Sequence, residues 1–247
     1  MSASSHSFPR QPQAPDVLGE LLHSLSQPLT SLRCSLELSL ELSPEEVAER
    51  QQESVAMALQ QTEKVIGMVQ LMREYLDAEQ PGPEASSTAL APSLRSVIED
   101  LASIAAVRGI QLRLVGTCLA AVPVPELRLR LALQYLITTM VEAQPAGNKI
   151  TLLLGEGPAG AVLRVEGQRG SHEPNFRDLE QNATSRSAKL DPVGPTSASL
   201  STLRRVRIAI ARRVLETAGA SLVLANGDAG PTGFVLRVPR RVGAPAQ

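Results

Sequence analysis

The side chain with the clearest capacity for chemistry is His23, which opens the segment HSLSQPLT over residues 23–30. An imidazole nitrogen is a competent nucleophile towards phosphoryl groups at neutral pH. Gln27 lies one helical turn further on, where it either contacts a phosphoryl group or a water or is an ordinary polar surface residue. Ser24 can accept a hydrogen bond but is not a useful base near pH 7 unaided. The segment therefore predicts either a nucleophile with two polar neighbours and no general base of its own, or an ordinary surface or core histidine.

These three residues must be positioned by a helix over residues 16–42. Its apolar residues recur in steps of three and four, which is typical of one buried stripe, and they are Leu18, Leu22, Leu25, Leu29, Leu32, Leu36 and Leu40. His23 falls on a polar strip beside this stripe, so we expect its imidazole to be exposed. Pro28 removes one backbone hydrogen bond and can bend the helix one turn beyond the histidine.

A second long helix follows almost at once. Ser43 as N-cap, Pro44 at the first helical position and two acidic residues after it form a helix-start signal. The apolar stripe then continues to about residue 79, which predicts an antiparallel helical hairpin. A hairpin alone buries only one face of each helix. We therefore expect two copies to pair as a dimeric four-helix bundle.

The rest of the chain changes to a mixed α and β pattern. Periodicity predicts helices over 92–107, 126–143 and 203–218, and strands over 110–115, 150–154, 161–166, 221–225 and 233–238. Between 170 and 199 we expect a long functional or disordered loop. The predicted organisation is a disordered tail (1–15), the helical hairpin (16–80), a linker (81–92), an α/β-sandwich domain (93–240) and a second tail (241–247).

Composition excludes several classes of function. The chain has 247 residues, 2% of them aromatic, and 24 basic against 25 acidic residues give a net charge of −1. It lacks both the cationic excess and the aromatic platforms that nucleic-acid binding needs. It also lacks a transmembrane run and a signal peptide. Two cysteines form no disulfide framework, and the three histidines are too widely spaced for zinc. We expect a cytoplasmic protein that neither binds nucleic acid nor spans a membrane.

Residues 16–240 resemble bacterial sensor histidine kinases of two-component signalling. Residues 23–30 are similar to the histidine box of that family, in which a phosphoacceptor histidine is followed by an acid and, five positions on, by proline. Four further segments are similar to parts of the family's ATP-binding domain: 109–112 to its first strand, 133–143 to the helix that carries paired asparagines, 208–219 to the helix after the nucleotide lid, and 230–239 to the final hairpin.

The sequence departs from this family where the family binds ATP. Tyr135 and Thr139 stand at the asparagine positions, segment 165–170 contains no Asp for the adenine, and Arg205 and Arg207 replace two lid glycines. Tyrosine is a poor magnesium ligand, and bulky residues hinder the approach of backbone N–H groups to a phosphate. We therefore predict a degenerate ATP site and assign no cofactor. The arginines between 204 and 213 could supply positive charge, but we interpret them as the solvated face of a helix.

The resemblance implies three alternative functions. The first is a phosphorelay protein in which His23 exchanges phosphoryl groups with the receiver domains of response regulators, as in histidine phosphotransferases with a kinase-like fold. Ser24, in place of the family's acid, weakens self-phosphorylation more than transfer, because the receiver supplies the Asp and the magnesium. The second is an active soluble histidine kinase with an atypical site for ATP and magnesium. The third is a non-catalytic module that binds a receiver or a kinase.

Overall fold

The computed structural model describes residues 17–41, 44–80, 87–157, 159–168, 202–227 and 230–239. The predicted tails, the loop over 170–199 and half of the predicted linker (81–86) lie outside these residues. The chain divides into two compact units, Met1–Val69 and Gln70–Gln247. None of the described helices is long and apolar enough to cross a lipid bilayer.

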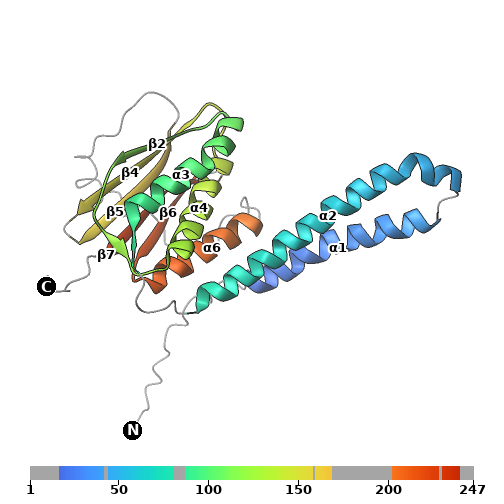
Figure 1. Ribbon diagram of the computed structural model, residues 1–247, viewed down its shortest axis with the longest axis horizontal. Helices are drawn as coiled ribbons and strands as arrows, with labels where there is room; N and C mark the ends of the chain where they lie inside the picture. The colour runs from blue at the N-terminus through green and yellow to red at the C-terminus, as the bar shows by residue number, and fades with distance from the viewer. Residues whose placement is uncertain are drawn as a thin grey trace, which may run out of the picture. The chain divides into compact units, whose positions relative to one another are not determined.

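The first unit is built from two long antiparallel helices (Figure 1), α1 (Val17–Glu41) and α2 (Pro44–Glu79), the last turns of which belong to the second unit. Both lie where the leucine steps and the Ser-Pro start signal predict them. The helices contact each other through Ser35 of α1, whose hydroxyl lies 3.4 Å from the Met57 sulfur of α2. The predicted helical hairpin is therefore confirmed.

The second unit carries a mixed sheet of five strands in the order β2-β4-β5-β7-β6. The strands are β2 (Gln111–Gly116), β4 (Lys149–Gly157), β5 (Gly160–Gln168), β6 (Ser221–Gly227) and β7 (Gly230–Pro239). Only β2 and β4 run parallel, with Gln111 opposite Lys149, and the helix between them provides the crossover that a parallel pair requires. The other neighbouring strands are antiparallel.

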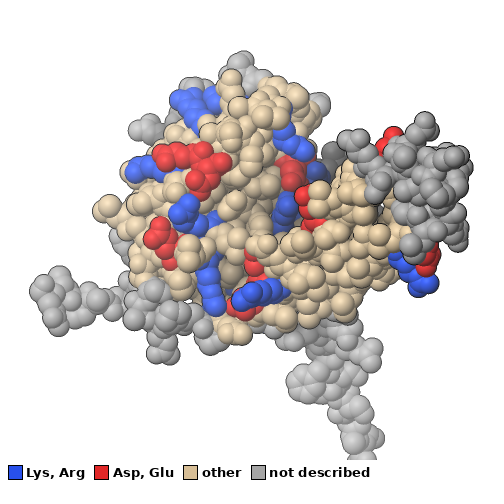
Figure 2. Space-filling view, turned by 45° about the vertical axis from the view of Figure 1, so that its right-hand side comes forward, with Lys and Arg blue, Asp and Glu red and all other residues tan. Residues whose placement is uncertain are grey.

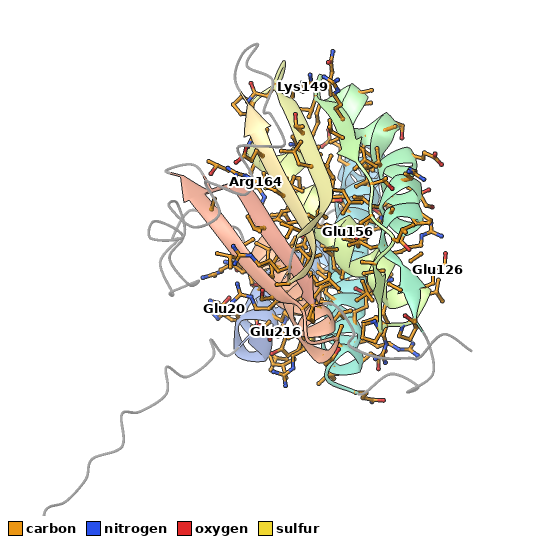
Figure 3. The ribbon with its side chains drawn as sticks, turned by 90° about the vertical axis from the view of Figure 1, so that its left-hand side faces the viewer. Glu20, Glu126, Lys149, Glu156, Arg164 and Glu216 are labelled. Atoms are coloured by element: carbon orange, nitrogen blue, oxygen red, sulfur yellow. The ribbon has the colours of Figure 1, made fainter. Side chains whose placement is uncertain are left out.

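Three helices cover one face of this sheet: α3 (Leu90–Val107) packs on β2, α4 (Glu126–Ala143) on β7 and α6 (Thr202–Thr217) on β6. Figure 3 shows the strands in front of the helices, with Arg164 on the opposite face of β5. Buried side chains alternate in β5, as in Leu163 and Val165, because one face of this strand meets the helices. In β4 residues 150–155 are buried on both faces. The result is a two-layer α/β sandwich.

The structure adds one feature that periodicity does not predict. Two short strands, β1 (Thr88–Ala89) and β3 (Ala121–Val122), pair in antiparallel fashion, and β1 falls inside the predicted linker. The Thr88 hydroxyl also donates a hydrogen bond of 2.7 Å to the Val124 carbonyl. Strands of two residues are too short to produce a detectable alternation, so only the tertiary structure reveals them.

Candidate functional site

His23 lies in the second turn of α1 and is exposed to solvent. This is the position that the polar strip of the sequence predicts for the imidazole. Gln27, one turn further along the helix, is also exposed, and Ser24 is half-buried. The structure therefore brings the three predicted site residues together on one stretch of a single helix.

Backbone hydrogen bonding changes locally beyond His23. Pro28 is buried and has no N–H, so the Ser24 carbonyl lacks its usual helical donor, although α1 continues without a break from Val17 to Glu41. Two hydroxyls bond back to the helix in the same stretch: Ser26 Oγ donates to the Leu22 carbonyl at 3.1 Å and Thr30 Oγ1 to the Ser26 carbonyl at 2.8 Å. Neither bond goes to the Ser24 carbonyl, so they do not replace the bond lost at Pro28, and back-bonding of this kind favours a local bend in the helix.

A band of large apolar side chains is exposed along the hairpin. We call it the hairpin apolar surface, and its members are Leu22, Leu29, Leu36, Val55, Met57, Leu59, Ile66 and Val69. Most of them belong to the stripes that the sequence predicts to be buried, yet Leu22, Val55, Leu59 and Ile66 are each 60% exposed. Figure 2 shows the corresponding broad area with few charged residues along the hairpin. Contiguous apolar surface of this kind usually marks an interaction site.

The positions on α4 that resemble the family's paired asparagines are already engaged with this chain's own groups. The Tyr135 hydroxyl donates a hydrogen bond to the carboxylate of Glu74, in the last turns of α2. The Thr139 hydroxyl is buried and donates at 2.7 Å to the Tyr135 carbonyl of its own helix. Burial, together with the carboxylate of Glu74, raises the pKa of Tyr135 well above its usual range, whereas the positive charge of Arg207 acts in the opposite direction.

An ion-paired cluster joins α4 to α6. Glu142 accepts hydrogen bonds from Arg204 Nε at 3.1 Å and from Arg207 Nη1 at 2.9 Å, and its backbone carbonyl accepts one from Arg204 Nη2 at 3.0 Å. The interpretation of the arginines as a solvated helix face is wrong for Arg204 and Arg207, because Glu142 of α4 draws both into the contact between the helices. Arg205 and Arg213 of the same helix are exposed.

The segment in which the sequence lacks the adenine-reading Asp packs against a side-chain amide. A Cβ atom on Gly167 would overlap the side chain of Gln144, which follows the last residue of α4. Asn148 fixes this amide by donating from Nδ2 to Gln144 Oε1 at 3.0 Å. Sequence reasoning missed Glu142 and Gln144. Their only signal is their place at the end of a predicted helix, which does not indicate their partners.

No group of three His, Cys, Asp or Glu side chains among the described residues is arranged to hold a metal ion. Oxygen donors near Tyr135 do exist in Glu74 and Glu142, but arginine and tyrosine already occupy them. Both carboxylates are thus already paired with groups of this chain, whereas Arg207 Nε is buried without a hydrogen-bond partner among the described residues.

Comparison with known proteins gives structural neighbours. The histidine kinase AdeS of Acinetobacter baumannii is similar with a TM-score of 0.57 and 16% identity, over 89% of this chain and 98% of that one. The histidine kinase ThkA, solved in complex with the response regulator protein TrrA, is similar with a TM-score of 0.57 and 16% identity, over 91% of this chain and 61% of that one. This chain has the fold of a bacterial sensor histidine kinase. No protein-family model and no curated protein matches it.

The histidine-kinase-like fold confirms the predicted class, a helical hairpin followed by an α/β sandwich. In this fold His23 belongs to the first helix of the hairpin, and Tyr135 belongs to α4 of the sandwich. The catalytic roles of His23, Ser24 and Gln27 stay predictions, as does the pairing of two hairpins.

Proposed function

We propose that this protein acts in two-component signalling as a phosphorelay protein, in which His23 accepts phosphoryl groups from the receiver domains of response regulators and returns them. The observation that carries the proposal is the exposed imidazole of His23 on the first hairpin helix of a histidine-kinase-like fold. The similar kinase ThkA has been solved with a response regulator, which makes a receiver domain the class of partner to test first.

The proposed reaction is a reversible transfer between nitrogen and oxygen. One imidazole nitrogen of His23 attacks the phosphorus of the receiver's acyl phosphate, the phosphorus–oxygen bond breaks, and the Asp carboxylate leaves with the bonding electrons. The ring loses its surplus proton to solvent, and the reverse reaction returns the phosphoryl group. In this proposal Gln27, which is exposed one turn beyond His23, donates from its amide to a phosphoryl oxygen. Positioning supplies most of the catalysis in such transfers, so the lack of a base at Ser24 is tolerable.

Two copies of the hairpin are expected to form the working unit. The hairpin apolar surface carries eight large apolar side chains that are exposed in the single chain, and a second hairpin offers a surface of the same chemistry. An isologous pair would bury both surfaces in a four-helix bundle while His23, on the polar strip, stays accessible.

The contacts made by α4 and by the residue that follows it support the further proposal that the sandwich does not bind ATP in the family's ordinary manner. Tyr135 and Thr139 make hydrogen bonds to protein groups in place of magnesium-binding amides. The arginine at 207 is paired with Glu142, and Gln144 packs on Gly167. If the chain is instead an active kinase, magnesium-dependent nucleotide binding should raise its thermal stability by mass action.

The test is phosphoryl transfer from a panel of receiver domains, each charged with radiolabelled phosphate. We expect acid-labile label on the wild-type protein and none on His23→Ala, whereas His6→Ala and His172→Ala keep the label. Gln27→Ala should slow transfer about tenfold, the scale of one hydrogen bond to a charged group, and the exposed glutamine variant Gln60→Ala should not.

Three other outcomes would reject the proposal. Label that survives His23→Ala places the phosphoacceptor elsewhere. Label taken directly from ATP and magnesium onto His23 identifies an active kinase. Receiver binding that His23→Ala leaves intact, with no label on any variant, identifies a non-catalytic interaction module.

A further inference from the structure

The last turns of α2 are attached to α4 at two points. Glu74 accepts the hydrogen bond from Tyr135, and the carbonyl of Gln80, just beyond the helix, accepts one of 2.8 Å from Arg128 Nη1. Tyr135 and Arg128 are seven residues apart, so they lie on the same side of α4. The attachment therefore extends over two helical turns.

The face of α2 that carries Glu74 is also the buried face of this segment. Leu71 and Ala78 are 7% and 4% exposed, and Glu74 lies between them at helical spacing. A carboxylate on this buried face loses part of its hydration. A hydroxyl group that donates a hydrogen bond to it compensates for that loss, but only as long as the hydrogen bond is formed. The Tyr135 hydroxyl is that donor.

Arg207 links this contact to α6. Its guanidinium carbon lies 6.0 Å from the centre of the Tyr135 ring, a cation–π geometry, and its Nη1 also bonds to Glu142. A positive charge over the ring draws electron density from the phenol and makes its O–H a stronger donor to Glu74. With Arg204 on the same Glu142, two guanidinium groups and two carboxylates balance each other in charge.

We propose that Glu74, Tyr135 and Arg207 form a latch that couples the last turns of α2 to α6 through the ring of Tyr135. The latch is closed when Arg207 lies over the ring and Tyr135 donates to Glu74. A partner or ligand that takes Arg207 away weakens the hold on α2, although it does not touch α2. The proposal needs no activity at His23, so it stands or falls separately from the phosphorelay role.

Amide hydrogen exchange of the full-length protein over residues 70–79 tests the latch. Tyr135→Phe keeps the ring but removes the hydroxyl, and we expect exchange in this segment to accelerate about tenfold or more, the effect of one hydrogen bond to a charged group. Arg207→Gln should accelerate exchange in the same segment, although residue 207 belongs to another helix. Arg205→Gln, an exposed arginine on the same turn of α6, is the matched control and should change nothing there.

A spectroscopic measurement covers the case in which a variant perturbs folding. The chain contains two tyrosines and no tryptophan, so Tyr75→Phe leaves Tyr135 as the sole ultraviolet-titrating phenol. Its titration should begin well above the ordinary range, and adding Glu74→Gln should lower it. Unchanged exchange over 70–79 in Tyr135→Phe or in Arg207→Gln, or unchanged titration on adding Glu74→Gln, would overturn the proposal.

Discussion

The hydroxyl of Tyr135 makes the stability of the folded protein depend on pH. Desolvation and the Glu74 carboxylate both disfavour the phenolate, which is why the pKa of Tyr135 is raised in the folded protein. An unfolded chain has an ordinary tyrosine that ionises near pH 10. The folded state therefore retains a proton that the unfolded state loses, and the resulting stability is fully present below about pH 10 and declines above it.

The corresponding prediction concerns alkaline unfolding. Between about pH 9 and 11, the Tm of the wild-type protein should fall more steeply than that of Tyr135→Phe, which has no phenolic proton to lose. Thermal unfolding followed by circular dichroism measures both slopes. Tyr75→Phe keeps Tyr135 and should behave as the wild type does. Parallel slopes in wild type and Tyr135→Phe would contradict the assignment.

At the scale of secondary-structure elements, the last residue of β2 has to be a glycine. Gly116 has φ +84°, and it is paired with Leu154 across the parallel strands β2 and β4. A Cβ at this position would overlap the Leu154 carbonyl oxygen, which belongs to the backbone of a central strand and cannot move aside. Both the left-handed conformation and the close approach thus require glycine here.

We expect Gly116→Ala to lower the free energy of unfolding by about 2–4 kcal/mol, from the left-handed strain and the overlap together. Gly147→Ala is the matched control, because Gly147 has φ +82° but open space around its Cβ position, and it should cost only about 1 kcal/mol. Urea unfolding measures both values. Equal losses in the two variants would mean that the Leu154 oxygen plays no part.

For the molecule as a whole, the proposed dimer depends on the hairpin apolar surface. Its residues come from both helices and are exposed in the single chain, as Leu59 and Ile66 illustrate at 60% each. The hydrophobic effect favours covering this surface. A second copy can do so through a symmetric contact.

A charge placed within this surface should prevent that assembly. Ile66→Glu would bury an unpaired carboxylate in the bundle, so we expect sedimentation equilibrium to change from dimer to monomer. Val107→Glu is the control, because Val107 is 90% exposed on α3 and lies outside the hairpin. A monomeric wild type, or a dimer that tolerates Ile66→Glu, would refute the pairing.

Most of the features that the sequence predicts correctly depend on interactions between residues that are close in the chain. The leucine steps of α1, the Ser-Pro start of α2 and the alternation in β5 depend on helix and strand periodicity, which neighbouring residues define by themselves. The exposure of His23 follows from the same periodicity. Short strands such as β1 fall below the length at which a period can be recognised.

The amino-acid sequence by itself determined the helices, the larger strands and the polar strip that presents His23, because each depends on interactions between residues close in the chain. Only the tertiary structure decided which charges meet. Glu142 and Arg204 are 62 residues apart, and Glu74 and Tyr135 are 61 apart. Their pairing depends on how α2, α4 and α6 pack, and no local pattern encodes the partner of a single charged residue.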